Sequence, residues 1–167
     1  MNSGPTIFIL KKREKRGSPF SHVQVGVRIM PRKDVYHDVV VQALTADGWT
    51  ITHDPLPLSY GGKDVYIDLG AAQPIGAEKG DRRIAVEIKS FLSPSDVHEL
   101  EVAIGQYALY RDILSEVEPE RALYLAIPER VYKGIFSDPL GQLVLARQQL
   151  RLIVFNDLQA RIERWIP

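Results

Sequence analysis

The chain has 167 residues, the size of one ordinary domain, and its 45% hydrophobic and 25% charged residues are typical of a globular protein. It contains no cysteine, which excludes disulfide bonds and thiolate metal sites and is compatible with the cytoplasmic location that we expect. No apolar run approaches the roughly 20 residues that a membrane span requires, so no membrane partner is expected.

The formal net charge of zero hides an asymmetry along the chain. Residues 1–33 carry eight Lys/Arg and one Glu, a balance of +7, whereas residues 34–167 carry 13 Lys/Arg and 20 Asp/Glu, a balance of −7. Affinity for a nucleic-acid backbone comes largely from Lys and Arg, so this acidic body is not a general nucleic-acid binder. The basic run at residues 11–16 could hold phosphate, but we interpret it as a solvated tail.

The N-terminal residues differ from the rest of the chain in composition and pattern. Residues 1–29 are interrupted by glycine and proline and are predicted to be a disordered basic extension, although alternation over residues 23–29 leaves a short strand open. Met30 would serve as a natural start. We therefore predict a single domain over residues 30–167.

Periodicity predicts several elements in the first half of this domain. Apolar residues at helical spacing follow Asp34, a favourable N-cap, and end at Gly48; a short strand over residues 49–53 and a turn at 54–57 come next. Alternation predicts a strand over 65–69 and a clearer one over 84–88. The interval 70–80 is typical of a loop or a short strand that ends in a hairpin turn.

The second half alternates helices with strands. The expected elements are a helix from Ser93 or Ser95 to about Val117, an apolar strand over 121–127, a helical turn over 128–136, a helix over 139–149, and strands over 150–155 and 160–166 joined by an Asn156-Asp157 turn. This order indicates a layered α/β domain.

Charged residues end the two central strands. Asp68 closes the first, and Glu87 and Lys89 share one face of the second because residues two apart in a strand point the same way. Two carboxylates, with the Ile88 carbonyl, are hard oxygen ligands suited to Mg²⁺ or Mn²⁺. Lys89 could orient a water or neutralise charge on a phosphoryl group. These groups are the parts of a phosphodiesterase site.

The spacing alone is not specific, since a salt bridge at the rim of a sheet gives the same pattern. Gln106 supports the functional interpretation because it is a polar residue among apolar neighbours on the helix that follows.

The pattern Asp68…Glu87-Ile88-Lys89, followed by a helix with Gln106, resembles the PD-(D/E)XK nuclease superfamily. The wider sequence, over about residues 30–167, resembles the XisH-type fdxN element excision controlling factor family. The matching segments are residues 33–38, 47–56, 68–71, 77–79, 84–91, 105–107 and 123–128.

The resemblance implies a restriction endonuclease-like core, with a mixed central β-sheet flanked by α-helices. It implies a role in programmed DNA excision in a cyanobacterial-type context, beside an XisI-type partner protein and a site-specific recombinase. Asp68 and Glu87 would be metal ligands, Lys89 the catalytic lysine and Gln106 a helper. Many resolvase-like members of the nuclease superfamily have an acidic ligand on the first helix; this sequence has no clear glutamate there, and Asp38 or His37 could stand in.

Other polar residues have simpler interpretations. We expect His37 to be a partly buried structural histidine, His53 and Asp54 to belong to a turn, and Ser90 to leave a strand. Glu78 and Lys79 are interpreted as an exposed hairpin edge, Tyr107 and Tyr110 as core, and Trp49 and Trp165 as core or interface anchors.

Two functions follow as hypotheses. The first is a metal-dependent endonuclease that hydrolyses DNA. The second is a catalytically weak or inactive accessory protein with a nuclease fold, which the −7 balance of the body favours. A homodimer would present two sites to two DNA strands, with Trp165 as a contact.

Overall fold

The computed structural model describes residues 32–74 and 81–167, and the elements below lie in the unit Lys33–Pro167. The predicted extension, residues 1–29, lies outside the described residues, as do Glu78 and Lys79. None of the described helices is long and apolar enough to cross a membrane.

A six-stranded sheet with the order β1-β4-β5-β6-β7-β8 forms the centre of the unit. Its strands are β1 (Thr50–His53), β4 (Leu69–Pro74), β5 (Asp81–Ile88), β6 (Ala122–Pro128), β7 (Leu152–Asn156) and β8 (Arg161–Ile166). The three strands β5, β6 and β7 are parallel, while β4 and β8 run antiparallel to their inner neighbours, and β1 runs antiparallel to β4. The predicted mixed α/β sheet is confirmed.

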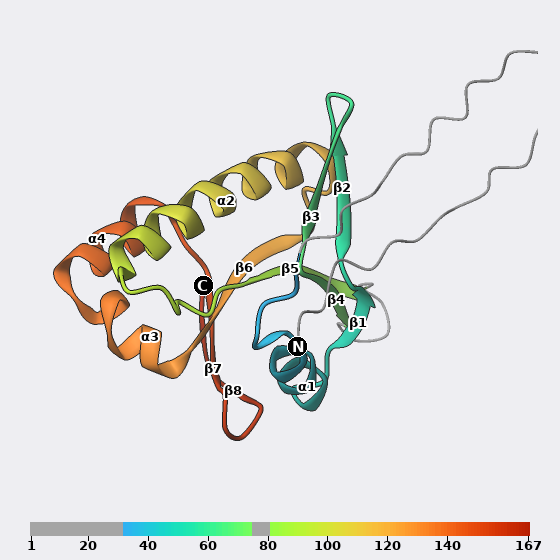
Figure 1. Cartoon of the computed structure of the whole chain (residues 1–167). Coiled ribbons are helices and arrows are strands. Elements are labelled where there is room, and N and C mark those ends of the chain that lie inside the picture. The colour runs from blue at the N-terminus through green and yellow to red at the C-terminus, as the bar shows by residue number, and fades with distance from the viewer. Residues whose placement is uncertain (1–31, 75–80) are drawn as a thin grey trace, which may run out of the picture. The chain divides into compact units, whose positions relative to one another are not determined.

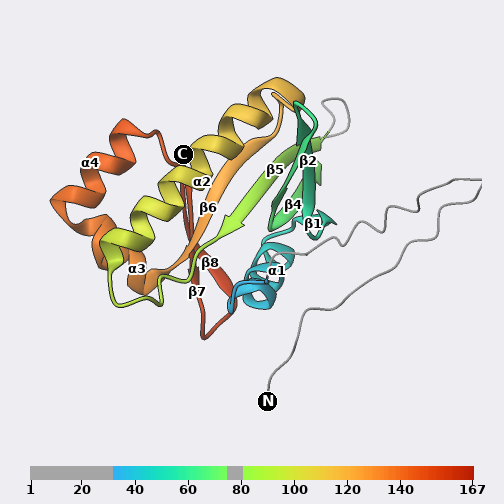
Figure 2. The ribbon, with the colours of Figure 1, turned by 45° about the horizontal axis from the view of Figure 1, so that its top comes forward.

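Helices cover both faces of this sheet (Figure 1). They are α1 (His37–Ala46), α2 (Asp96–Val117), α3 (Glu129–Lys133) and α4 (Pro139–Arg147), with a 3-10 turn η1 (Ile135–Ser137). Helix α1 packs with Val86 of β5 in one apolar cluster, and α2 packs with Leu125 of β6 in the other. Figure 2 shows α2 lying along β6. Successive residues of the inner strands therefore face two different cores.

Local signals set the ends of these elements as predicted. Ser95 caps α2, because its hydroxyl accepts the N–H of His98 at 3.2 Å, and α2 ends at Val117. The Asn156 carboxamide oxygen accepts two main-chain N–H groups in the turn between β7 and β8. These side chains satisfy main-chain donors that would otherwise lack partners.

The prediction of a turn over residues 54–57 is wrong for its last two residues. A strand, β2 (Leu56–Tyr60), begins there and pairs with β3 (Lys63–Ile67) in a separate two-stranded sheet, with Pro57 opposite Tyr66. The proline obscured the strand, although a two-stranded ribbon has free edges on which proline is tolerated. Gly61 and Gly62 form the turn between the two strands, and both residues have positive φ, 57° and 76°.

The single strand predicted over residues 65–69 is also corrected. Strand β3 ends at Ile67 in the hairpin, and β4 begins at Leu69 in the central sheet. Asp68 is thus the single residue between β3 of the hairpin and β4 of the central sheet. The predicted short strand after Gly70 exists as the rest of β4, which ends at Pro74.

Candidate functional site

Asp68 and Glu87 lie opposite each other where β4 and β5 meet. The ladder ends with Leu69 opposite Val86, so the next residues are Asp68 and Glu87, and the main-chain amide of Asp68 donates to the Glu87 carboxylate. Glu87 is only 4% exposed. Burial raises its pKa to about 7, and the charge of Asp68 adds to this effect. Burial also raises the pKa of Asp68. The two carboxyl groups therefore resist being ionised together.

Lys89 lies on the same face, as its spacing from Glu87 predicts. Its Nζ atom is 3.1 Å from Glu87 Oε1, and both side chains are largely buried. The ammonium group opposes the rise in the pKa of Glu87. The sequence therefore correctly predicted that an acidic pair and a lysine would meet.

Three successive amides at the end of β5 donate to three different segments of the chain. The Ile88 N–H donates to Asp68 Oδ2 at 2.8 Å, and the Lys89 N–H donates to the Ala126 carbonyl of β6 at 3.0 Å. The Ser90 N–H donates to Asp34 Oδ2 at 3.0 Å. These three hydrogen bonds fix the main chain that carries Glu87 and Lys89. The role of the Ile88 carbonyl as a metal ligand stays a prediction.

Helix α2 brings Tyr110 to this region and also carries Gln106. Gln106 lies one turn before Tyr110, and its side-chain oxygen is buried without a hydrogen-bond partner among the described residues. Tyr110 belongs to the core, as expected. Its pKa is nevertheless raised to about 12, first by burial and then by the charges of Glu87 and Asp68. Sequence analysis missed this proximity because a tyrosine among apolar helical positions signals only burial.

The two candidate site residues on α1, His37 and Asp38, differ in burial. His37 is 3% exposed, and its Nε2 atom is 2.9 Å from Asp54 Oδ2, whereas Asp38 is exposed. Asp54 also binds Lys33 at 3.1 Å, so it does more than form a turn. Burial would raise the pKa of Asp54, but hydrogen bonds from His37 and Lys33 bring it below its ordinary value. His37 is thus buried as predicted, with a carboxylate partner that its sequence neighbours do not reveal.

The metal ligands that this arrangement offers are limited. Within residues 32–74 and 81–167, no three His, Cys, Asp or Glu side chains gather closely enough to hold an ion. Asp68 and Glu87 alone could supply two carboxylates. Such a sparse set suits Mg²⁺, which commonly keeps several waters and binds one or two protein carboxylates together with a substrate phosphate.

Comparison with known proteins gives the family. A sequence profile described as XisH protein matches residues 30–163. The chain belongs to the XisH family. Two solved structures are similar to this XisH-family chain, each at 40% sequence identity with a TM-score of 0.72.

The first is the crystal structure of an XisH family protein from Nostoc punctiforme PCC 73102, with 80% of this chain and 100% of that chain covered. The second is the crystal structure of a fdxN element excision controlling factor protein from Anabaena variabilis, with 81% of this chain and 100% of that chain covered. A comparison with curated proteins finds no match. The predicted family is therefore confirmed.

The two tryptophans of this XisH-family chain pack together. Trp49 is 3% exposed, its ring centroid lies 5.6 Å from that of Trp165, and Trp165 meets Tyr124 edge-on at 5.1 Å. Arg82 lies over both indoles. Trp49 is core, as predicted. Trp165 stacks within the same cluster, and its role as a dimer contact stays a prediction.

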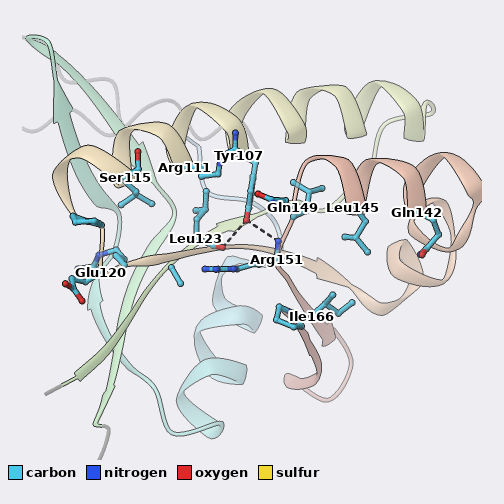
Figure 3. A pocket seen from close by; sticks show the side chains of 17 residues that line it. Tyr107, Arg111, Ser115, Glu120, Leu123, Gln142, Leu145, Gln149, Arg151 and Ile166 are labelled. Carbon is cyan, nitrogen blue, oxygen red and sulfur yellow. Dashed lines mark hydrogen bonds between the residues drawn. The ribbon is translucent and has the colours of Figure 1, made fainter. Parts of the chain in front are cut away.

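A separate hollow of about 790 Å³ lies at the opposite end of the parallel strands, where β6 and β7 begin (Figure 3). Its wall includes Arg111 of α2, Leu145 of α4 and Ile166 of β8. Tyr107 fixes its floor, since the hydroxyl donates to the Leu123 carbonyl at 3.2 Å and accepts the Arg151 N–H at 3.1 Å. This explains why a tyrosine stands in the core at that position.

The substitution Tyr107→Phe is expected to lower the free energy of unfolding by about 1–3 kcal/mol, because it leaves a buried carbonyl and a main-chain N–H without partners. Urea denaturation measures this change. Tyr60→Phe is the matched control, since Tyr60 is 53% exposed, and a change below about 0.5 kcal/mol is expected there. Equal losses in both variants would contradict the assigned role.

Proposed function

We propose that this chain is a metal-dependent endodeoxyribonuclease with a restriction endonuclease-like core of the PD-(D/E)XK type. The observation that carries the proposal is the position of Asp68 opposite Glu87, with Lys89 Nζ 3.1 Å from the Glu87 carboxylate. Two acidic groups and an ammonium group meet at the end of a central strand. This combination serves the hydrolysis of a phosphodiester bond.

The chemistry of the donor set fits Mg²⁺ or Mn²⁺. Asp68 and Glu87 would hold the ion, whose charge would offset the burial that raises the pKa of both carboxyl groups. When bound, the ion supplies an activated water and polarises the phosphoryl oxygen. Lys89 would orient that water or neutralise charge on the phosphoryl group. Gln106, whose buried oxygen lacks a partner among the described residues, would position a group in the site.

Family membership supports the biological setting. The Anabaena variabilis structure at 40% identity is that of a fdxN element excision controlling factor protein. We place this chain in the same kind of process, the excision of a DNA element. Its partners there would be DNA, an XisI-type protein and a site-specific recombinase, in the cytoplasm.

A second function is favoured by a specific observation. Residues 34–167 carry a balance of −7, and a cleft that binds DNA usually has a positive rim. In the accessory alternative, cleavage is weak or absent, and the domain works by binding an XisI-type partner or a recombinase. A partner that supplies the DNA-binding surface would reconcile the two functions.

The test is to incubate the full chain with duplex, branched and single-stranded DNA, with Mg²⁺, with Mn²⁺ and with a chelator. The assay is run with and without the XisI-type partner. Metal-dependent cleavage is expected on at least one substrate, and Asp68→Asn should reduce it at least ~100-fold, because one of the two carboxylate ligands is lost. Asp38→Asn is the matched control, since Asp38 is exposed on α1.

Cleavage that survives Asp68→Asn would overturn the site assignment. Absence of cleavage on every substrate, with and without the partner, would overturn the nuclease proposal and favour the accessory function.

A further inference from the structure

His37 is a buried histidine whose ring is fixed through one nitrogen. Its Nε2 atom lies 2.9 Å from Asp54 Oδ2, and Asp54 has a lowered pKa, so its carboxylate is ionised and can only accept a hydrogen bond. Nε2 must therefore carry the proton that it donates to Asp54. The second ring nitrogen, Nδ1, is therefore left to form a hydrogen bond elsewhere.

The Nδ1 atom of His37 is buried and has no hydrogen-bond partner among the described residues. A buried polar atom without a partner is unfavourable, and such atoms in folded proteins commonly bind a water or a ligand. Lys33 does not relieve this, because its Nζ atom binds the Asp54 oxygen Oδ2 and not the ring. The ring is thus prepared to form a hydrogen bond with a group that is not protein.

The surroundings of His37 indicate where this group lies. The Ile88 amide at the end of β5 donates to Asp68 Oδ2, so Asp68 lies beside the segment that also binds the start of α1. Asp34 precedes His37, accepts its N–H through the main-chain carbonyl at 3.0 Å, and binds the Ser90 amide through its carboxylate. The start of α1 is therefore attached to the end of β5, beside Lys89.

We propose that His37 is a positioning residue that binds, through Nδ1, a water in contact with Asp68. The inference rests on the proposed metal site and adds a residue to it. His37 is not itself a ligand of the ion, because no three acidic or histidine side chains of the described residues are close enough to share one. A carboxylate that fixes a histidine, which in turn holds a group of a metal site, is a frequent arrangement outside the ligand set.

Two substitutions at one position separate this role from simple packing. In His37→Asn the amide oxygen takes the place of Nδ1, whereas in His37→Gln the amide reaches toward Asp54 and nothing replaces Nδ1. The measurement is the dissociation constant for Mn²⁺ alone, by titration calorimetry of the full chain. His37→Gln is expected to weaken binding about 10- to 100-fold, and His37→Asn by less than about threefold.

His53→Asn is the matched control, since His53 is exposed and its ring is hydrogen-bonded to the hydroxyl of the adjacent Thr52. Its affinity for Mn²⁺ should equal that of the unaltered chain. Urea denaturation of each variant establishes that it is folded at the temperature of the titration.

The outcomes separate the inference from the proposed function. If His37→Gln binds Mn²⁺ normally while Glu87→Gln does not, the inference is overturned and the metal site stands. Equal weakening by Asn and Gln would also overturn the inference, because the ring would then act only through packing. If the unaltered chain fails to bind millimolar Mn²⁺, the metal-dependent function itself fails.

Discussion

Replacing Glu87 with glutamine is expected to stabilise the metal-free fold and, in the same molecule, to abolish cleavage. Glu87 is 4% exposed, and its folded pKa is about 7, against an ordinary value of 4.5. Glutamine has the shape of the protonated side chain but never ionises. It therefore avoids the unfavourable burial of a charge, while it removes a proposed metal ligand.

The pH dependence follows from the raised pKa of Glu87 in the folded chain. Below about pH 4.5 the carboxyl group is protonated in both the folded and the unfolded chain, so the substitution changes little. As the pH rises from 4.5 through 7, the unfolded chain ionises first, and the folded state loses stability relative to it. At pH 8 the gain from Glu87→Gln should approach about 3 kcal/mol, since a tenfold difference in proton affinity between the folded and unfolded chain corresponds to about 1.4 kcal/mol.

Urea denaturation at pH 5 and pH 8, with a chelator present, measures this gain. Cleavage should fall at least ~1,000-fold in Glu87→Gln, and Lys89→Ala should lose about 100- to 10,000-fold, the range ordinarily supplied by a positioned acid or base. Lys133→Ala is the control, because Lys133 is exposed and pairs with Glu129 on the surface of α3. A Glu87→Gln variant that is destabilised at pH 8, or that still cleaves, would contradict the role assigned to Glu87.

Substitution of glycine by alanine is expected to change the free energy of unfolding in opposite directions at two helical positions. A Cβ atom at Gly141 of α4 would lie 1.9 Å from the Ile135 carbonyl oxygen and 2.7 Å from Phe136 Cα. Both are main-chain atoms and cannot turn aside, so Gly141→Ala should lower the free energy of unfolding by about 3 kcal/mol or prevent folding. The close approach is what allows α4 to begin directly after η1.

Gly105 of α2 is the control for that substitution. A Cβ atom there would meet nothing within 4 Å. Gly105→Ala should therefore raise the free energy of unfolding by about 0.5–1 kcal/mol, because alanine loses less backbone entropy in a helix. Urea denaturation of both variants at one pH gives the comparison. Destabilisation of similar size at both positions would mean that the packing between α4 and η1 is not the cause.

The central elements could be predicted because their signals are local. Alternation around Ile84 and Ile88, the cap at Ser95 and the turn at Asn156 each specify structure within a few residues. The same is true of the pair Glu87 and Lys89, whose shared face follows from the period of a strand.

Features that depend on distant contacts could not be predicted in this way. The strand that begins at Leu56 forms by pairing with β3, where Pro57 lies opposite Tyr66, and the local propensity of proline does not suggest a strand there. The interaction between His37 and Asp54 joins residues that are 17 positions apart. Tyr110 belongs to the core as predicted, but its proximity to the acidic pair depends on how α2 packs along β6.

The position of Asp68 between two sheets has a mechanical consequence. Strand β3 belongs to the hairpin and β4 to the central sheet, so the position of Asp68 is set by both sheets. The hydrogen bond from the Ile88 amide joins Asp68 to the end of β5. Leu56, Leu58 and Ile67 of the hairpin share an apolar cluster with α2, so a substitution that disturbs this packing is expected to displace a carboxylate of the candidate site.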